Sequence, residues 1–306
     1  MTQEIQGVIN ELEKIIVGKR AALTKLLVCV LAGGHALLDD VPGVGKTTLA
    51  TAMSRVLGLR QRRIQFTPDV LPSDIVGFSI YDKETGGLVY MPGVVSDANI
   101  LLADEINRTS SKTQAALLEA MEERQVTVDG KTHALQDPFI VIATQNNVGS
   151  AGTQLLPFAQ LDRFLMRFSI GYPDLESQIA MIRDRQDSNP LVDTQQVVDM
   201  PRLIAMQGEV RAVTVKNSVI EYIAKLALLS RQVGEGGLGI SPRGALCIAR
   251  AAKAHAYISG RNFATPSDVQ AVFFDVCAHR VIVPPSMQLQ AVLEGWLNTV
   301  PLPDMG

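Results

Sequence analysis

The chain has 306 residues, of which 47% are hydrophobic, 19% charged and 5% aromatic, which is enough for one large or two modest domains with a packed core. A formal net charge of -3 excludes a strongly basic nucleic-acid-binding protein, and the longest apolar run, Leu26–Leu38, is shorter than the about 20 residues that cross a bilayer. The cysteines Cys29, Cys247 and Cys277 lie far apart without metal-ligand spacing, which favours a reducing cytoplasm over a disulfide framework.

The first half of the chain alternates between predicted helices and short apolar strands. Apolar residues recur at helical spacing over Glu4–Val17, and a second helix is predicted over Lys19–Ala32, ending at Gly33-Gly34. The predicted strands are Ala36–Leu38, Ile64–Phe66, Ile100–Ala103, Phe139–Ala143 and Phe164–Ile170. The predicted helices among them are Thr47–Leu57 and Lys112–Glu123. This alternation predicts an α/β fold, with a mainly parallel sheet between helices.

Beyond about Pro173 the strand signals fade and helical patterns take over. The predicted helices there are Leu175–Arg185, Ser218–Val233, Pro242–Ser259 and Pro266–Arg280, of which the last two begin at Ser241-Pro242 and Thr265-Pro266. We therefore expect an α/β domain over residues 1–172 and an all-helical domain over residues 173–306.

A glycine-rich loop between the first strand and the following helix is the sharpest local signal. It consists of Asp40, Val41, Pro42, Gly43, Val44, Gly45, Lys46, Thr47 and Thr48. Gly43 and Gly45 let backbone N–H groups approach phosphates closely, Lys46 would reach the β- and γ-phosphates, and the Thr47 hydroxyl would bind Mg²⁺. Asp40 replaces the first glycine of the usual pattern and is expected to put an acidic group at the rim of the loop. The alternative is a glycine-rich turn with a surface lysine.

Two adjacent carboxylates follow the buried strand Ile100–Ala103. Asp104 is placed to hold Mg²⁺ through water, and Glu105 is placed to orient or deprotonate an attacking water. Carboxylates at the end of a buried strand are costly to desolvate unless a cation or hydrogen bonds compensate. The alternative is that Asp104 simply caps the next segment. Together with the loop, the pair predicts a Mg²⁺-dependent nucleoside triphosphate site.

Longer motifs resemble one family. The stretches Ile100–Arg108, Lys112–Thr127, Gln65–Gly77 and Gln160–Phe164 are similar to those of the MoxR family of AAA+ ATPases, and the resemblance runs from about Ile15 to Val281. It implies ATP as the nucleotide and a ring-forming αβα core followed by a helical lid. It also implies an insert in the second helix over about residues 77–95 and a β-hairpin over about residues 125–137, with Asp129-Gly130 as its turn.

The resemblance further implies site residues. Asn146 matches the sensor-1 residue that positions the lytic water, and its alternative is a turn residue. Arg163 matches the arginine finger that points into the neighbouring subunit's ATP site, with Arg167 as the reserve candidate. The alternative for Arg163 is an ion pair with Asp162 or another carboxylate of its own chain.

Two more positions are carried over from the lid and from the amino-terminal helices. Arg243, in Ser241-Pro242-Arg243, matches the sensor-2 arginine that contacts the γ-phosphate from the lid, although a nearby acid could satisfy it instead. Val17-Gly18 resembles the segment that packs against adenine, and plain helix-to-helix packing is the alternative.

The family points to a function that the residues alone do not name. It implies an ATPase that forms a homo-oligomeric ring, expected to be a hexamer, and remodels or activates a partner protein, typically one with a von Willebrand factor A domain. The alternatives are a nucleic-acid-associated or chelatase-type AAA+ motor subunit and a nucleotide-gated scaffold with little hydrolysis. The net charge and the lack of a basic, aromatic-interleaved loop argue against nucleic acid. Asp104, Glu105 and Asn146 argue against the scaffold.

Several smaller features have ordinary interpretations. The four histidines lie in unrelated segments and are interpreted as structural residues rather than metal ligands. Glu119, Glu122 and Glu123 are expected to form a solvated helix face, with a contact to the next subunit as the lesser alternative. The basic residues Arg250 and Lys253 are attributed to helix ends rather than to nucleic-acid binding.

Overall fold

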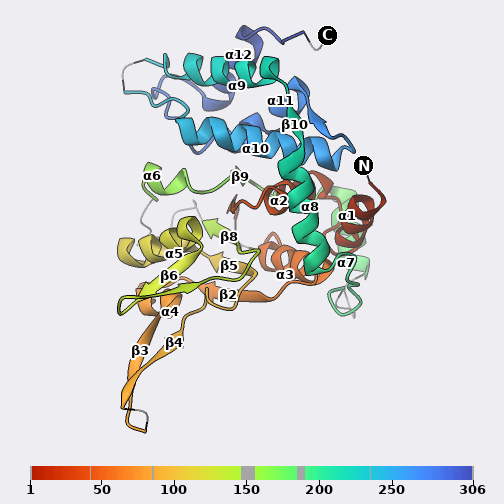
Figure 1. Ribbon diagram of the computed structural model, residues 1–306. Helices are drawn as coiled ribbons and strands as arrows, with labels where there is room; N and C mark the ends of the chain where they lie inside the picture. The colour runs from red at the N-terminus through yellow and green to blue at the C-terminus, as the bar shows by residue number, and fades with distance from the viewer. Residues whose placement is uncertain are drawn as a thin grey trace.

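A parallel five-stranded sheet forms the centre of the computed structural model, which describes residues 2–41, 43–84, 86–145, 156–184, 190–234 and 236–304 (Figure 1). Its order is β2-β5-β8-β1-β9. The strands are β1 (Ala36–Asp39), β2 (Gln61–Gln65), β5 (Ile100–Asp104), β8 (Ile140–Gln145) and β9 (Met166–Phe168). All of them run in the same direction, as the sequence predicted. Their carboxyl ends therefore meet at one edge of the sheet and their amino ends at the other.

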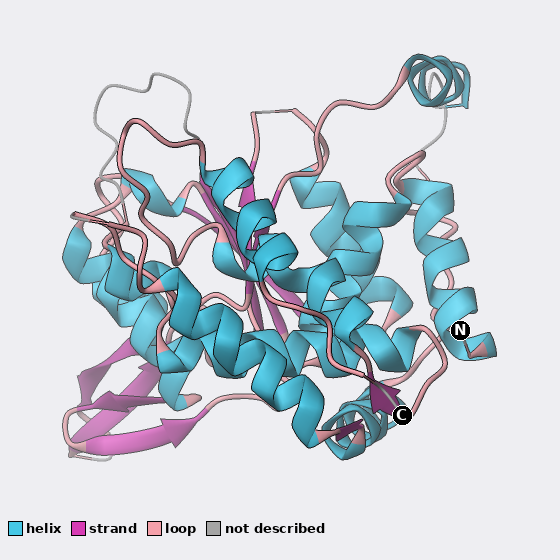
Figure 2. Ribbon diagram, turned by 90° about the horizontal axis from the view of Figure 1, so that it is seen from above, coloured by secondary structure: helices cyan, strands magenta, loops and turns pink. Residues whose placement is uncertain are grey.

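Both faces of the sheet are buried. Along β5, Ile100 and Leu102 pack into one apolar cluster while Leu101 and Ala103 pack into a second on the opposite face, as expected from the alternation of side chains along a strand. Helices cover both faces, and Figure 2 shows the strands between them. The helices of this part are α1 (Gln3–Ile15), α2 (Arg20–Leu31), α3 (Lys46–Val56), α4 (Pro72–Val76), the 3-10 helix η1 (Ile106–Arg108), α5 (Ser111–Glu123) and α6 (Phe158–Leu161). Helix α7 (Leu175–Asp184), which the sequence placed at the start of the helical domain, lies against the turn after α1 through Ser177.

Two antiparallel hairpins interrupt this α/β pattern. The first pairs β3 (Gly77–Asp82) with β4 (Gly87–Pro92) and projects from the body of the molecule (Figure 1). The second pairs β6 (Gln125–Val128) with β7 (Lys131–Ala134). Its turn residues Asp129 and Gly130 both have positive φ, at 49° and 73°, which is the backbone that a tight two-residue hairpin turn requires.

The carboxyl-terminal part is mainly helical. Its helices are α8 (Met200–Ala212), α9 (Asn217–Ser230), α10 (Pro242–Ile258), α11 (Pro266–Cys277) and α12 (Leu289–Thr299). The side chain of Ser241 caps α10 by accepting the Gly244 N–H at 2.9 Å, and Thr265 opens α11 in a capping box. A short parallel pair, β10 (Thr214–Val215) with β11 (Phe263–Ala264), adds strand structure that the all-helical prediction did not include.

This helical part shares an apolar cluster with the face of the sheet that α1, α2 and α3 cover. All three cysteines are buried and unpaired. Among the described residues, no helix combines the length and the apolar character needed to cross a membrane.

Candidate nucleotide site

The loop between β1 and α3 has the backbone of a phosphate cradle. Gly43 and Gly45 have φ of 85° and 91°, a backbone conformation that residues with a side chain rarely adopt. The space where a Cβ would point is open at both positions, with no atom within 4 Å. The Lys46 ammonium donates to the carbonyl oxygens of Asp40 at 2.9 Å and Val41 at 3.4 Å, so it lies over the loop. Thr47 and Thr48 follow in the first turn of α3, where N–H groups have no helical partner. The loop therefore fits a bound anion; the predicted residue Pro42 lies outside the described residues.

Asp40 does not expose an acidic group at the rim of this loop, in contrast to what the sequence suggested. Its side chain is buried and accepts three hydrogen bonds, from the Ser169 hydroxyl at 2.5 Å and from the backbone N–H groups of Ile170 at 2.7 Å and Gly171 at 2.9 Å. Asp40 thus ties the loop to the segment that leaves β9. The buried carboxylate of Asp40 is stabilised because each of these three contacts is a hydrogen bond donated to it.

Asp104 ends β5 at the same edge of the sheet and is almost fully buried. One carboxylate oxygen accepts the Thr144 hydroxyl at 2.6 Å, and the other accepts the Arg63 guanidinium at 2.9 Å. The Thr144 oxygen also accepts the Glu105 backbone N–H at 2.8 Å, so one hydroxyl fixes both acids of the predicted pair. Both oxygens of Asp104 are therefore engaged by partners from neighbouring strands.

Glu105 has an unusual backbone and a well-defined side chain. Its φ is 56°, a left-handed conformation that costs a non-glycine residue of order 1 kcal/mol and is often found at functional sites. Its carboxylate accepts hydrogen bonds from the Gln65 amide at 2.9 Å and from Arg108 at 2.8 Å. The local sequence pattern gives no signal for these two partners or for Arg63 and Thr144. The register of β2 on β5 places Gln65 opposite Asp104, but that pairing is not visible in the local pattern.

The turn Val17-Gly18 and the phosphate loop both contact the segment that follows β9. A Cβ at Gly18 would meet the Ser177 hydroxyl at 2.0 Å, and the adjacent Lys19 donates to the carbonyl of Tyr172. The segment that Asp40 binds leads directly into these residues. Asn146, the expected sensor, lies outside the described residues.

The two predicted arginines lie at the opposite edge of the sheet, and both contact Glu122. Arg163 Nε lies 3.0 Å from one carboxylate oxygen of Glu122, and Arg243 Nη1 lies 3.0 Å from the other. Arg163 precedes β9, and nearby Leu165 donates its N–H to the carbonyl of His35, the residue just before β1. This places Arg163 at the amino ends of the strands, whereas Lys46 follows their carboxyl ends.

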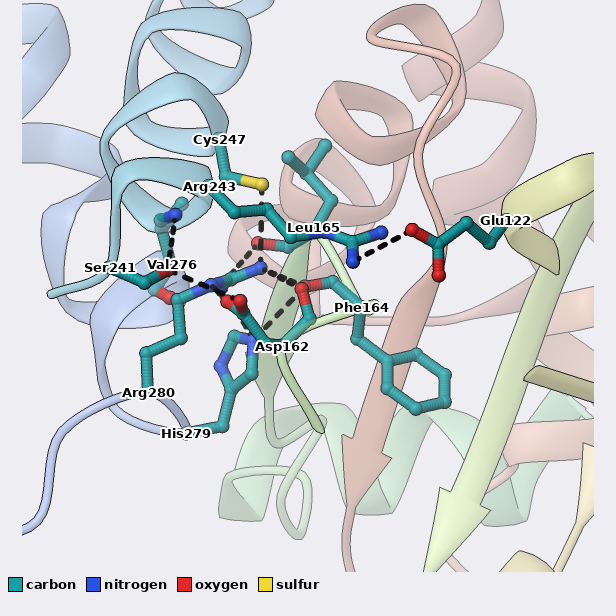
Figure 3. A network of polar contacts seen from close by, with 11 residues as sticks. Glu122, Asp162, Phe164, Leu165, Ser241, Arg243, Cys247, Val276, His279 and Arg280 are labelled. Carbon is teal, nitrogen blue, oxygen red and sulfur yellow. Dashed lines mark hydrogen bonds and ion pairs between the residues drawn. The ribbon is translucent and has the colours of Figure 1, made fainter. Parts of the chain in front are cut away.

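A buried guanidinium holds the backbone on either side of Arg163 (Figure 3). Arg280 donates to the Asp162 carboxylate at 2.7 Å and to the carbonyl oxygens of Asp162 at 3.0 Å, Phe164 and Leu165 at 3.2 Å. Its side chain is 1% exposed. Residues 162–165 are therefore fixed to the end of α11, and the position of Arg163 depends on the helical part.

The reserve candidate Arg167 has a different environment. It lies within β9, and its guanidinium donates to Asp39 on the neighbouring strand β1, with Nε at 3.1 Å. It takes no part in the cluster at Glu122. The side chains of Arg163 and Arg167 are about equally exposed, at 28% and 26%, and each is paired with an acid of its own chain.

Comparisons with known proteins agree with this architecture. The profile of the ATPase family associated with various cellular activities (AAA) matches residues 35–166, and that of the AAA lid domain matches residues 223–294. The chain is 42% identical to the uncharacterized protein YeaC of Bacillus subtilis, over 96% of this chain and 93% of that protein. It is 36% identical to the chaperone MoxR1 of Mycobacterium tuberculosis, over 98% and 83% of the two chains.

A solved structure resembles the whole chain. The crystal structure of a proposed ATPase from Cytophaga hutchinsonii superposes with a TM-score of 0.89 at 35% identity, covering 98% of this chain and 95% of that one. The phosphate loop, the paired carboxylates, the sheet order and these relatives lead to one assignment. The chain belongs to the MoxR family of AAA+ ATPases.

Proposed function

We propose that this chain is a Mg²⁺-dependent ATPase whose active site is completed between two copies of the chain. The observation that carries the proposal is the separation of its parts. Lys46, Asp104 and Glu105 follow the carboxyl ends of the strands, whereas Arg163 and Arg243 lie beyond the amino ends. The four residues of β1 alone span about 13 Å between these edges. The arginines therefore serve the nucleotide of a neighbouring copy.

Each group has a defined role in this proposal. The loop N–H groups and Lys46 hold the triphosphate, while Thr47 and Asp104 hold Mg²⁺, which neutralises phosphate charge when bound. Mg²⁺ usually keeps several waters and is bound by one or two carboxylates together with phosphate oxygens, so we expect water and phosphate oxygens to complete its coordination. Glu105 orients the attacking water and accepts its proton.

The neighbouring copy supplies the positive charge. Arg163 and Arg243 neutralise charge that develops on the transferred phosphoryl group, a contribution of about 10³–10⁵ in rate in other nucleotide hydrolases. The buried contacts of Arg280 support this role, because they hold the backbone of residues 162–165 in place.

We further propose that hydrolysis remodels a partner protein in the cytoplasm, from a ring that we expect to be a hexamer. The relative named a chaperone supports this proposal. So does the projecting β3–β4 hairpin, which exposes the apolar side chains Phe78, Tyr81 and Leu88. The family resemblance favours a partner with a von Willebrand factor A domain.

The test is ATP turnover per chain as a function of protein concentration, with Mg²⁺ saturating. We expect a steep rise, because each site needs its neighbour. Mixing Lys46→Ala with Arg163→Ala chains, each inactive alone, should restore part of the activity, since some contacts then join two intact halves. A monomer that hydrolyses ATP at the full rate would contradict the proposal.

A further inference from the structure

Glu122 contacts Arg163 and Arg243, which in the proposed mechanism act on the nucleotide of a neighbouring copy. Its two carboxylate oxygens each lie 3.0 Å from a guanidinium nitrogen, one of Arg163 and one of Arg243. These three residues come from α5, from the segment before β9 and from the first turn of α10. Figure 3 shows the Arg243 side chain extending from α10 toward Glu122 on α5. Two guanidinium groups on opposite oxygens of one anion is also the arrangement in which arginines bind a phosphoryl group.

The cluster opens into a cationic cavity of about 600 Å³ at the amino edge of the sheet. Glu122 is the only carboxylate among the described residues that line this cavity. The basic lining residues are Arg124, Arg163, Arg211, Arg243, Arg250 and Lys253. The Glu122 side chain is 35% exposed, and those of Arg163 and Arg243 are 28% and 42% exposed, so an incoming anion can reach all three.

Three other cations of the cavity are held mainly by backbone carbonyls, and one of them, Arg124, also lies 3.8 Å from the Asp137 carboxylate. Arg124 donates to the carbonyl of Gly33 at 2.7 Å, and Arg250 donates to that of Ala32 at 2.9 Å, both at the end of α2. Lys253 donates to the carbonyl of Arg211, at the end of α8, at 2.8 Å. Carbonyls at helix ends carry only partial negative charge, which leaves the cavity strongly positive. These carbonyls belong to the ends of α2 and α8, whereas Arg250 and Lys253 themselves lie on α10.

We infer that Glu122 is a placeholder for phosphate: it holds Arg163 and Arg243 ready in the free chain and is displaced when a phosphoryl oxygen enters between them. This inference rests on the proposed function, in which that oxygen belongs to the nucleotide of a neighbouring copy. Glu122 keeps the two like charges together and ordered without a ligand. It also competes with the ligand, so removing its charge should tighten anion binding at this edge.

The first experiment measures anion binding without hydrolysis. Inorganic tripolyphosphate is titrated by calorimetry into dilute Lys46→Ala chain, in which the phosphate loop has lost its lysine. Adding Glu122→Gln should tighten binding about threefold to tenfold, the range expected for two exposed ion pairs. Glu123→Gln is the matched control, because it removes the same charge from the next residue of α5, and it should change binding less than twofold. Adding Arg163→Met and Arg243→Met should weaken binding about tenfold or more.

Equal effects of Glu122→Gln and Glu123→Gln would overturn the inference, because they would reflect net charge alone. Weaker binding by Glu122→Gln would overturn it too, since Glu122 would then help to hold the anion. The inference would also be overturned if neither the parent chain nor the Glu122→Gln chain bound tripolyphosphate.

The second experiment uses the otherwise unmodified chain and ATP. Glu122→Gln should lower the protein concentration at half-maximal turnover by about threefold to tenfold, whereas Glu123→Gln should leave it unchanged. An unchanged or higher concentration for Glu122→Gln would contradict the placeholder role. A chain that hydrolyses no ATP at any concentration would refute the proposed function instead, and the tripolyphosphate titration would still decide the role of Glu122.

Discussion

Replacing Asp40 by glycine restores the residue usual at that position of a phosphate loop, yet it should destabilise this protein. Asp40 accepts two backbone N–H groups, from Ile170 at 2.7 Å and Gly171 at 2.9 Å, as well as the Ser169 hydroxyl. A hydrogen bond to a charged group contributes about 1.5–3 kcal/mol, and the hydroxyl can turn to another partner. Counting the two N–H groups alone, each at the lower end of that range, gives a loss of about 3 kcal/mol. The extra freedom of glycine in the unfolded chain adds about 0.5–1 kcal/mol.

Urea unfolding measures this loss directly. With a slope of about 3 kcal/mol per M, the midpoint of Asp40→Gly should fall by about 1 M. Asp40→Asn keeps one acceptor oxygen and should lose about half as much. Asp193→Gly, at an exposed aspartate, is the control and should lose only about 0.5–1 kcal/mol, the contribution of the glycine itself. If Asp40→Gly unfolds at the midpoint of the parent, the three hydrogen bonds do not stabilise the loop and the reasoning fails.

Three further predictions concern other parts of the molecule. Glu105→Gln should bind ATP within about threefold of the parent but hydrolyse it about 10²–10⁴-fold more slowly, in nucleotide-binding and turnover assays; undiminished turnover would remove Glu105 from its role. Arg280→Met should cost about 3–5 kcal/mol of unfolding free energy, because it leaves the Asp162 carboxylate without its cationic partner, and adding Asp162→Asn should recover part of this loss. If the two substitutions change the unfolding free energy additively in denaturant unfolding, Arg280 and Asp162 are not coupled as proposed. Burial lowers the pKa of His35 from 6.5 to about 3, so between these values the unfolded chain binds the extra proton and stability falls as the pH falls. From pH 7 to pH 5 the parent should lose about 2 kcal/mol more than His35→Asn, and equal losses would show that His35 does not remain neutral.

Local patterns predicted the elements that carry the chemistry. The apolar run over Ile100–Ala103 followed by two acids located β5 and its site residues, and Ser241-Pro242 located the start of α10. Helix α8 was missed. Its buried face consists of Leu203, Met206, Gln207 and Val210, and the polar Gln207 weakens the apolar helical pattern.

Contacts between distant segments were beyond the reach of local patterns. Thr144 joins Asp104 to Glu105 only because β8 pairs with β5, and the pairing of strands is set by the whole fold. The same applies to Glu122, which the sequence assigned to a solvated helix face. Its position at the end of α5 is exposed, as predicted, but the arginines that it contacts come from segments about 40 and 120 residues further along the chain.

The location of the two half-sites on opposite edges of one sheet determines how many sites an assembly can contain. A contact that joins a phosphate loop to the arginines of the next copy is head-to-tail, and repeating it gives either a closed ring or an open filament. An open row of copies always has an unused phosphate loop at one end and unused arginines at the other. It therefore holds one complete site fewer than its number of chains. Closing the row removes that deficit, so in the proposed ATPase turnover per chain would report ring closure as well as assembly.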